Sequence, residues 1–376
     1  MAVDRIREIS PTEALGLQRE GGRLVDVREP DEHALGLPEG ALAIPRAALE
    51  SAPSRYVSPD ETILLICGSG RRSMLAAESL AAQGYGSLCS VAGGMSAWQT
   101  AGLPVRTTED ADFLERYSRH LRLPQVGIEG QKRLEQARVL MVGAGGLGSP
   151  AAFYLAAAGV GFLRIVDNDQ VDRSNLQRQI LHTESRIGMD KVESAQQALS
   201  ALNPRTRFDA LTLRLDADNV ESLLGDVDVV VDGADNFPTR YLLSDACVQL
   251  GKPLVYGAVH RFEGQASVFD AGRQRGVAPC YRCLFPEAPR AEDAPNCAEA
   301  GVLGVLPGII GLLQATEAIK LILGIGQPLS GRLLHFDALS MRFRETRLHP
   351  DPDCPVCAPG RVFPGYRQMA EICGSA

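Results

Sequence analysis

Short apolar runs that end in glycine-rich loops recur along the chain and predict its main elements. Residues 62–66 and 139–142 are apolar and rich in β-branched side chains, as is typical of buried strands. Each run leads through glycines into a predicted helix, at 74–83 after the first and up to residue 158 after the second. Residues 162–166 predict another strand, and residues 226–236 predict a strand that runs out into a loop. Strands that alternate with helices predict an α/β fold.

The second of these loops has the spacing of a phosphate-binding turn. Gly143, Gly145 and Gly148 form a G-x-G-x-x-G pattern between the predicted strand and the predicted helix. Glycines let the backbone approach a phosphate, and the helix N-terminus offers free N–H groups and a positive dipole. Asp167 ends the next strand, where a carboxylate can accept hydrogen bonds from a ribose. These residues predict a nucleotide site and favour neither NAD nor ATP.

Polar residues beyond Asp167 favour ATP. Asn175 and Arg178 follow this strand closely, and Lys191 comes 13 residues after Arg178. A dehydrogenase has no need of this set, whereas fixed cations and donors stabilise the charge on a transferring phosphoryl group. We therefore predict a triphosphate substrate and keep a nicotinamide Rossmann domain as the alternative.

The first glycine-rich loop begins with a cysteine. Cys67 directly follows the predicted strand, and Gly68, Gly70 and Arg72 come before the helix. The N–H groups of such a loop can converge on one anion, and a helix N-terminus lowers the pKa of a thiol. Four residues separate Cys67 from Arg72, whereas cysteine phosphatases have five, which make room for a phosphate. The count favours sulfur chemistry over phosphate hydrolysis.

Composition narrows the class of protein. A net charge of −8 and a pI near 5.4 argue against non-specific binding to nucleic acid or to an anionic membrane surface. The N-terminus lacks the apolar core of a signal peptide. Residues 302–326 are apolar but contain Glu317 and Lys320, which predicts a buried helix rather than a membrane span. Nine cysteines, four of them in C-x-x-C pairs, then predict a cytoplasmic protein with metal and thiol chemistry.

The nucleotide motifs resemble one family over roughly residues 113–360. The glycine turn, Asp167, the Ser-Asn-Leu-Gln-Arg-Gln run at 174–179 and Lys191 resemble the adenylating enzymes that activate ubiquitin-like sulfur carriers. The closest likeness is to molybdopterin-synthase adenylyltransferase and its thiamine-pathway relative. The resemblance implies a Rossmann-like domain that binds ATP and Mg²⁺.

The resemblance also implies roles for individual residues. Asp167 would hold the ribose, and Asp235 would bind Mg²⁺ at the phosphates, since this ion is held by one or two carboxylates plus phosphate oxygens. The full implied nucleotide site consists of Gly143, Gly145, Gly148, Asp167, Asn175, Arg178, Lys191, Asp235 and Asn236.

The N-terminal motifs resemble a single rhodanese domain over residues 5–105. These motifs are Asp-Val-Arg-Glu at 26–29, the Cys67 loop, and Val-Ala-Gly-Gly-Met-Ser-Ala-Trp at 91–98. The resemblance implies that Cys67 carries a persulfide. An inert rhodanese-like module is the alternative. We interpret Asp26 and Arg28 as a structural ion pair, and Met95 and Trp98 as core residues.

The domain boundary lies in a polar stretch. We predict a rhodanese-like sulfurtransferase domain at 1–105, a linker at 106–112 and an adenylyltransferase domain at 113–376. Arg119 lies in an Arg-Tyr-x-Arg motif just after the linker. The resemblance implies that it reaches into the nucleotide site of a partner subunit as an arginine finger, so the functional unit would be a homodimer.

Two C-x-x-C pairs predict a metal site. Cys280 with Cys283, and Cys354 with Cys357, supply four thiolates, which can close a tetrahedral zinc shell. One such pair alone could be a redox pair, and disulfides or free thiols remain the alternative. The family has Zn²⁺ at these positions. A closed shell would tie the C-terminal tail to the core and would not perform the chemistry.

One further thiol falls on a predicted flexible loop. Residues 286–299 are polar and rich in proline, and Cys297 lies near their end. In the family a loop here crosses over the carrier tail. Cys297 could therefore accept the acyl group as a thioester or join an acyl disulfide, and an incidental surface cysteine is the equal alternative.

The two predicted domains together imply one reaction sequence. The second would adenylate the C-terminal glycine of a ubiquitin-like sulfur carrier ending in Gly-Gly, most simply the molybdopterin-synthase small subunit. The first would supply persulfide sulfur, drawn from thiosulfate or a cysteine desulfurase, to make a carrier thiocarboxylate. The alternative is an adenylyltransferase for the thiamine-pathway or another carrier, with the rhodanese module as a docking domain.

Overall fold

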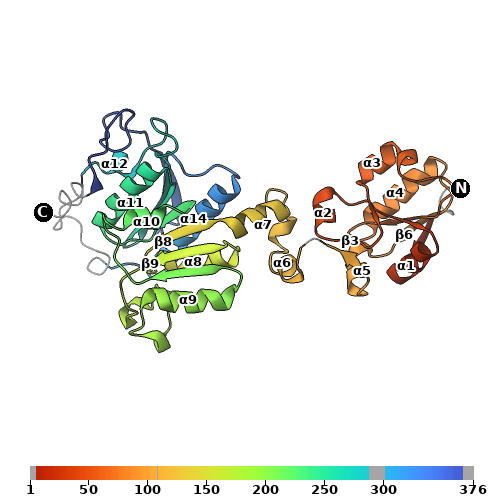
Figure 1. Cartoon of the computed structure of the whole chain (residues 1–376), viewed down its shortest axis with the longest axis horizontal. Coiled ribbons are helices and arrows are strands. Elements are labelled where there is room, and N and C mark those ends of the chain that lie inside the picture. Colours follow the sequence, from red (N-terminus) through yellow and green to blue (C-terminus); the bar gives the residue numbers. More distant parts are fainter. Residues whose placement is uncertain (1–5, 108, 288–300, 367–376) are drawn as a thin grey trace. The chain divides into compact units, whose positions relative to one another are not determined.

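The computed structural model describes residues 6–107, 109–287 and 301–366 (Figure 1). Its internal contacts divide the chain into two compact units, residues 1–131 and 132–376. The division falls within helix α7 (Gly127–Gln136). Both units are α/β, as predicted.

The first unit is built on a parallel sheet with strand order β1-β6-β5-β2-β4. Its strands are β1 (Ile6–Ile9), β2 (Arg23–Asp26), β4 (Leu42–Ala43), β5 (Ile63–Ile66) and β6 (Leu88–Val91), and β3 (Leu37–Pro38) pairs with β7 (Val105–Arg106). Its helices are α1 (Pro11–Arg19), α2 (Pro30–Ala34), α3 (Arg46–Ser51), α4 (Arg71–Ala82), α5 (Gly94–Thr100) and α6 (Ala111–Arg116), with short 3-10 helices η2 (Pro53–Arg55) and η3 (His120–Arg122).

Two hydrophobic clusters fill the first unit because its central strands are buried on both faces. One cluster joins alternate residues of β5 to Leu49 of α3 and Leu80 of α4. The other joins the remaining residues of β5 to Met95 and Trp98 of α5. Trp98 is fully buried, so the prediction that Met95 and Trp98 are core residues is confirmed.

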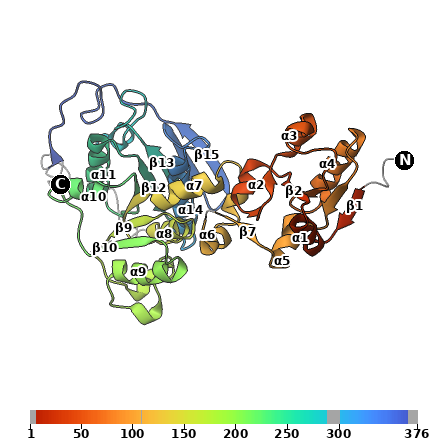
Figure 2. The ribbon, with the colours of Figure 1, turned by 45° about the vertical axis from the view of Figure 1, so that its right-hand side comes forward.

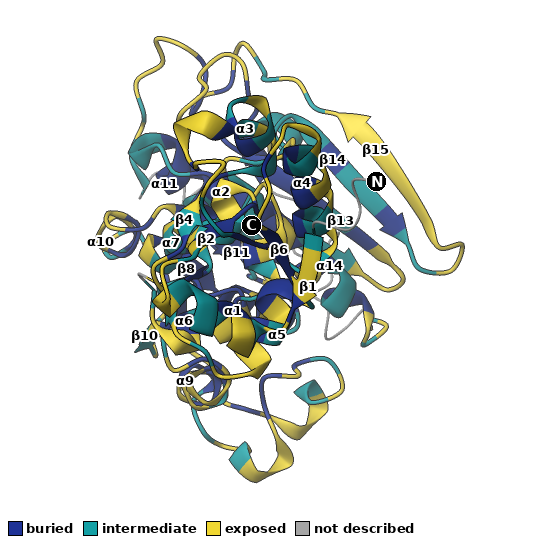
Figure 3. Cartoon of the chain, turned by 90° about the vertical axis from the view of Figure 1, so that its right-hand side faces the viewer, coloured by how far each residue is buried: buried dark blue, intermediate teal, exposed yellow. Residues whose placement is uncertain are grey.

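The second unit is built on a larger mixed sheet, with strand order β10-β9-β8-β11-β12-β13-β14-β15. The first five strands are parallel, and the last three continue the sheet in antiparallel fashion. Strands β12 and β13, where the direction changes, lie side by side (Figure 2). The strands are β8 (Arg138–Val142), β9 (Phe162–Val166), β10 (Arg207–Leu211), β11 (Val229–Asp232), β12 (Leu254–His260), β13 (Glu263–Phe269), β14 (Arg332–Asp337) and β15 (Arg342–Arg347). Strand β15 is exposed along its whole length (Figure 3).

Two groups of helices cover the larger sheet (Figure 1). The first group is α8 (Gly148–Ala157), α9 (Lys191–Leu202) and α14 (Leu306–Leu323), and the second is α10 (Val220–Leu224), α11 (Phe237–Leu250) and α12 (Tyr281–Leu284). Two 3-10 helices, η4 (Arg173–Asn175) and η5 (Glu184–Arg186), lie between β9 and α9.

Helix α14 corresponds to the apolar stretch of the sequence. By length and composition it is the one helix among the described residues that could cross a membrane, but 50% of it is buried within the protein. It packs on α8 and across β11, β12 and β13. Gln314 of this helix donates to the carbonyls of Asp232 and Val255, at 2.6 and 3.2 Å. The helix therefore fits the predicted buried element.

The strand order places a ligand crevice at the end of β8. The chain leaves β8 for β9 on one side, whereas β11 lies on its other side. In open α/β sheets such a reversal opens a crevice at the carboxyl ends of the strands. The glycine turn, Asp167 and the loop after β11 all lie at these ends.

Candidate active sites

The glycine turn after β8 requires glycine at two of its positions. Gly143 has a φ of +97°, and a Cβ there would lie 2.6 Å from the carbonyl oxygen of Gly233. A Cβ on Gly148 would lie 2.0 Å from the carbonyl oxygen of Gly143. At Gly145 a Cβ would meet only the Gln179 side chain, at an ordinary 3.5 Å. The tight turn therefore depends on its first and last glycines.

Asp167 fastens this turn to the end of β9. Its carboxylate accepts the N–H of Ala144 at 2.8 Å and that of Asp169 at 2.9 Å. Burial raises the pKa of Asp167, and the charge of Lys191 and the two N–H donors offset this only in part. Each carboxylate oxygen keeps a second lone pair, so Asp167 can still accept from a ribose hydroxyl.

Lys191 is the first residue of α9, and its side chain is almost completely buried. Its Nζ donates to Asp169 Oδ2 at 2.7 Å, and only 6% of the side chain is exposed. Its backbone N–H donates to the carbonyl of Asp169 at 2.9 Å. The ammonium group is thus held in a fixed position at the carboxyl end of the sheet, in the lining of the cleft described below, where it could contact a phosphate.

Asn175 and Arg178 form a second polar group on the segment after β9. Arg178 donates to Asn175 Oδ1 at 2.9 Å and to the Ser174 carbonyl at 3.2 Å. Asp172 begins this segment and accepts from both the N–H and the hydroxyl of Ser174. Asp172 therefore has a structural role, because its carboxylate shapes the turn that presents Arg178.

Asp235 and Asn236 lie on the loop between β11 and α11. Asn236 caps α11 by accepting the N–H of Thr239 at 3.0 Å, and its amide donates to Asp235 Oδ1 at 3.3 Å. Asp235 is exposed and precedes the positive end of the helix. A carboxylate in this position is available to an ion at the mouth of the crevice.

One cleft of about 1130 Å³ joins these groups. Eight of the nine predicted nucleotide residues line it, namely Gly143, Gly145, Asp167, Asn175, Arg178, Lys191, Asp235 and Asn236. Gly148 is buried at the start of α8 and supports the turn from behind. Arg119 is exposed on the turn before η3 and is not among the lining residues. Cys297 lies outside the described residues.

The cleft continues beyond the nucleotide residues into a part that the motifs did not predict. Its wall there comes from β12, β13 and α12, with His260, Glu263, Gln265, Tyr256, Tyr281 and Phe285. Tyr281 packs against Tyr256 and Phe285, with ring centroids 5.6 and 5.0 Å apart. Tyr256 and Tyr281 are 2% and 1% exposed, so these rings form a firmly packed wall of the cleft beside the nucleotide residues.

A buried ion pair supports the loop that carries Asp235. Arg240 donates to the carbonyls of Ala234 at 2.8 Å and Gly257 at 3.1 Å, and its Nε lies 3.8 Å from Asp232 Oδ2. Asp232 is 1% exposed and accepts the N–H of Ala234, and burial raises its pKa. Arg240 therefore holds the loop after β11 against β12, since its guanidinium donates to a carbonyl of each.

Arg240→Met is expected to lower the free energy of unfolding of the second unit by about 3–5 kcal/mol, because it leaves a buried carboxylate without its charge partner. Adding Asp232→Asn should restore part of this loss, since the neutral amide oxygen can still accept from Ala234. Urea unfolding followed by circular dichroism measures both variants. Equal destabilisation in the single and double variants would contradict the role of Arg240 as the charge partner of Asp232.

The Cys67 loop in the first unit surrounds a sulfur atom with donors. Cys67 follows β5 and is fully buried, and its Sγ accepts from Gly70 N–H at 3.2 Å and from Ser73 Oγ at 3.4 Å. Burial opposes ionisation, but hydrogen bonds from Ser73, Ser69 and Gly70 together lower the pKa of the Cys67 thiol. Gly70 has a φ of +93°, in the left-handed region that favours glycine.

Neighbouring segments hold this loop in place. The N–H of Met95 donates to the Cys67 carbonyl at 2.7 Å. Arg72 forms a bidentate pair with Glu32 of α2, at 2.6 and 2.7 Å, so its guanidinium is engaged beside the loop. Asp26 and Arg28 form a buried ion pair, with a contact of 2.6 Å, as predicted.

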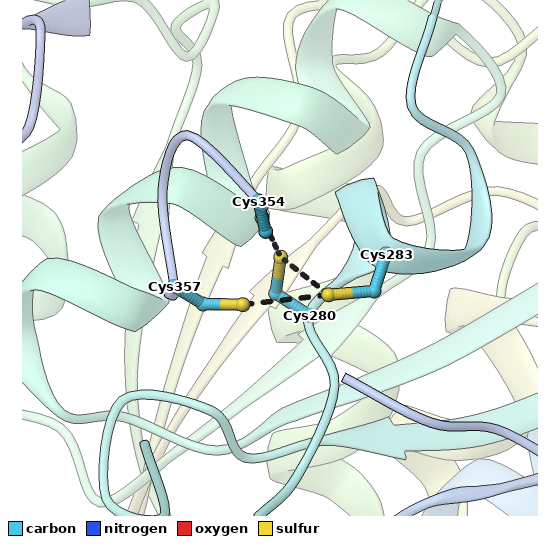
Figure 4. Close-up of side chains that lie close together, drawn as sticks. All are labelled: Cys280, Cys283, Cys354 and Cys357. Atoms are coloured by element: carbon cyan, nitrogen blue, oxygen red, sulfur yellow. Dashed lines mark hydrogen bonds between the residues drawn. The ribbon is translucent and has the colours of Figure 1, made fainter. Parts of the chain in front are cut away.

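The four predicted metal cysteines meet in one cluster. Their sulfur atoms all lie within 4.8 Å of one another and point toward a common centre (Figure 4). Cys280 directly precedes α12 and Cys283 lies within it, whereas Cys354 and Cys357 come from a turn near the C-terminus. Four thiolates at this spacing fit a tetrahedral zinc shell, and the described cysteines form no disulfide.

Comparisons with known families assign both units. A family model described as the ThiF family matches residues 117–356, which is more than half of the chain. The chain belongs to the ThiF family. A model of the rhodanese-like domain matches residues 10–101. Both family resemblances inferred from the sequence are therefore confirmed.

Two curated proteins illustrate the relationship of this ThiF family member. The sulfur carrier protein adenylyltransferase of Thermus thermophilus is 53% identical over 65% of this chain and 90% of its own length. The probable adenylyltransferase/sulfurtransferase MoeZ of Mycobacterium tuberculosis is 51% identical over 64% of this chain. The match spans 61% of the length of MoeZ.

A solved structure shares the fold of the ThiF unit. The crystal structure of E. coli MccB superposes with a TM-score of 0.57 and 20% sequence identity, over 71% of this chain and 81% of MccB. This likeness supports the Rossmann-like architecture of the fold class.

Proposed function

We propose that the second unit adenylates the C-terminal glycine of a ubiquitin-like sulfur carrier. An oxygen of the carrier carboxylate attacks the α-phosphorus of ATP, the bond to the bridging oxygen breaks, and pyrophosphate leaves. The product is a carrier acyl-adenylate. The names and sequence identities of the relatives support this activity.

The observation that carries the proposal is the composition of the 1130 Å³ cleft. Lys191 and Arg178 supply positive charge on one side of it, Asp167 supplies a ribose acceptor, and Asp235 supplies a carboxylate for Mg²⁺. The displacement needs no protein nucleophile, because positioning and charge neutralisation lower its barrier. The part of the cleft lined by β12, β13 and the segment from Tyr281 to Phe285 would hold the extended carrier tail.

We further propose that Cys67 supplies the sulfur. The Cys67 thiolate attacks the outer sulfur of thiosulfate, sulfite leaves, and a persulfide remains. The persulfide attacks the carrier adenylate, which releases AMP and forms an acyl disulfide. A small thiol then attacks Cys67 Sγ, so that the S–S bond breaks and the carrier leaves as a thiocarboxylate. The thiolate-stabilising loop around Cys67 supports this role.

Two parts of the proposal depend on groups beyond a single described chain. Arg119 is exposed, which leaves it available to complete the nucleotide site of a second copy in a homodimer. Cys297 is proposed as an acceptor of the acyl group. The functional domains are proposed as residues 1–105 and 113–376, joined by the linker 106–112.

Mass spectrometry of the intact carrier tests the proposed function. The full chain is incubated with Mg-ATP, thiosulfate, a small thiol and the molybdopterin-synthase small subunit. Without thiosulfate we expect the adenylate, and with thiosulfate we expect one oxygen of the carrier to be replaced by sulfur. If neither this carrier nor the thiamine-pathway carrier changes mass, the proposal is wrong. An adenylate that never becomes a thiocarboxylate would favour a docking role for the first unit.

The cysteine cluster is proposed to hold one structural Zn²⁺. Cys354→Ser is expected to reduce bound zinc from about one ion per chain to near zero and to destabilise the second unit by several kcal/mol, because metal binding contributes directly to folding. Elemental analysis and thermal unfolding measure the two effects. Cys89→Ala, which removes a buried thiol of the first unit, should keep the zinc. Full zinc content in Cys354→Ser would exclude this ligand set.

A further inference from the structure

Two buried serines form a chain of polar contacts that leads to the sulfur of Cys67. Ser73 Oγ lies 3.4 Å from Cys67 Sγ, and Ser90 Oγ lies 2.9 Å from Ser73 Oγ. Ser73 is in the first turn of α4, and Ser90 is on β6, the strand beside β5. Both residues are 0% exposed, so bulk solvent does not reach their hydroxyl groups.

Counting protons shows why the second serine matters. Each hydroxyl has one proton to donate and can accept from others. Ser73 Oγ has three polar neighbours within reach, namely Cys67 Sγ, the Gly70 carbonyl at 3.0 Å and Ser90 Oγ. If Ser73 donated its proton to Ser90, that proton would no longer be available for a hydrogen bond to Cys67 Sγ. If Ser90 donates instead, the proton of Ser73 is shared only between the Gly70 carbonyl and Cys67 Sγ, and a negative charge on the sulfur attracts it more strongly than the neutral carbonyl does.

We propose that Ser90 is a positioning residue for sulfur transfer, which donates to Ser73 Oγ and thereby directs the Ser73 proton toward Cys67 Sγ. The proposal rests on the proposed role of Cys67 as the sulfur carrier. When an acceptor such as cyanide attacks the outer sulfur of the persulfide, the S–S bond breaks and its electron pair stays on Cys67 Sγ. The relay stabilises that charge, since a polarised hydroxyl is a stronger donor in a buried network.

The charged groups around the loop do not replace this relay. Arg72 of α4 interacts electrostatically with Cys67, but its guanidinium is engaged by Glu32 of α2. Glu29, which also acts on Arg72, adds further negative charge on this side. The donors aimed at the sulfur are therefore Ser73 Oγ and the N–H groups of the loop.

A thiolate titration tests the relay. The ultraviolet absorbance of the thiolate is followed against pH in the full chain, and each variant is referenced to the same variant carrying Cys67→Ala. We expect Ser90→Ala to raise the Cys67 pKa by about half a unit to one unit, the equivalent of one modest hydrogen bond. Ser90→Thr, which keeps the hydroxyl, should titrate like the wild type.

Two further variants separate the relay from general loosening of the loop. Ser96 Oγ donates to the Gly68 carbonyl at 3.1 Å, in the same loop but away from the sulfur, so Ser96→Ala should leave the Cys67 pKa unchanged. Because Ser90 acts through Ser73, the pKa in Ser73→Ala should not rise further when Ser90→Ala is added. An unchanged pKa in Ser90→Ala, or additive effects of the two substitutions, would overturn the proposal.

The same proteins distinguish failure of the relay from failure of the proposed function. Thiosulfate is added to the wild type, and mass spectrometry of the peptide that contains Cys67 shows whether one sulfur atom has been added. If no sulfur is found there, Cys67 is not the carrier, whereas the titration still decides whether Ser90 directs the proton of Ser73. If sulfur is found, transfer to cyanide should be slowed about three- to tenfold in Ser90→Ala, in step with the pKa.

Discussion

Lys191→Met is expected to slow carrier adenylation about 10²- to 10³-fold, the usual loss when one preorganised group that stabilises transition-state charge is removed. The Lys191 side chain is 6% exposed and its ammonium group is fixed by Asp169, so a methionine there removes a preorganised charge that solvent is poorly placed to replace. ATP–pyrophosphate exchange in the presence of the carrier measures the rate. Because the attack and departure of pyrophosphate both place charge on the phosphates, we expect the loss mainly in kcat.

Lys252→Met is the matched control for this substitution. Lys252 donates to the carbonyl of Gly225 and is not among the cleft-lining residues. The ATP–pyrophosphate exchange rate of Lys252→Met should stay within about twofold of the wild type, since substitutions away from the cleft have little effect. Equal rates for the Lys191 and Lys252 variants would remove Lys191 from the proposed mechanism.

The parts of the site that follow strands could be predicted from the sequence. The apolar run of β8, the glycines after it and Asp167 at the end of β9 are adjacent in the sequence, and each has a local physical reason to be there. Parallel strands bring their carboxyl ends to one edge, so Asp235 after β11 joins them in the same cleft. Local order along the chain was therefore enough to assemble most of the nucleotide site.

The partners of these residues could not be predicted in the same way. The pairing of Lys191 with Asp169 depends on how the segment between β9 and α9 folds back, which no periodic pattern encodes. His182 was missed for the same reason, although it joins the carbonyl of Ala144 at 3.0 Å to Ser194 of α9 at 2.9 Å. Such contacts are fixed only when distant segments pack.

The wall of the cleft beyond the nucleotide residues gave no signal in the sequence. Tyr256 and Gln265 lie on two antiparallel strands, where alternate residues face the same side without forming a motif. The four cysteines show the opposite case, since the C-x-x-C spacing fixes each pair locally and four thiols suit one metal. The sequence therefore predicts sites whose chemistry is local and misses those made by register.

The buried serine on β6 illustrates this limit. Ser90 stands in an apolar strand, Leu-Cys-Ser-Val, and a single serine there has no distinguishing neighbour in the sequence. Its place beside Ser73 results from the parallel pairing of β6 with β5, which brings Ser90 level with Leu65, two residues before Cys67. Only the register of the sheet shows that its hydroxyl faces the sulfur loop.

Cys67→Ala is expected to abolish thiosulfate-dependent formation of the carrier thiocarboxylate and to leave adenylation unchanged. The reason is that a methyl group cannot form a persulfide, whereas the adenylation cleft is lined by residues of the second unit. Intact mass of the carrier measures both products in one sample. In the wild type, sulfur loading should persist at pH values below the pKa of an ordinary thiol. The reason is that the loop lowers the pKa of Cys67 and so keeps the thiolate populated at those pH values.

Cys89→Ala provides the matched control, since it removes another buried thiol of the first unit. Cys89 lies on β6, and burial raises its pKa, so it stays protonated and unreactive at neutral pH. We expect Cys89→Ala to make adenylate and thiocarboxylate at wild-type rates. Supplying inorganic sulfide should restore thiocarboxylate formation in Cys67→Ala, because sulfide can attack the adenylate directly and release AMP. If Cys67→Ala instead makes thiocarboxylate from thiosulfate as fast as Cys89→Ala, the first unit serves in docking and sulfur reaches the adenylate by another thiol.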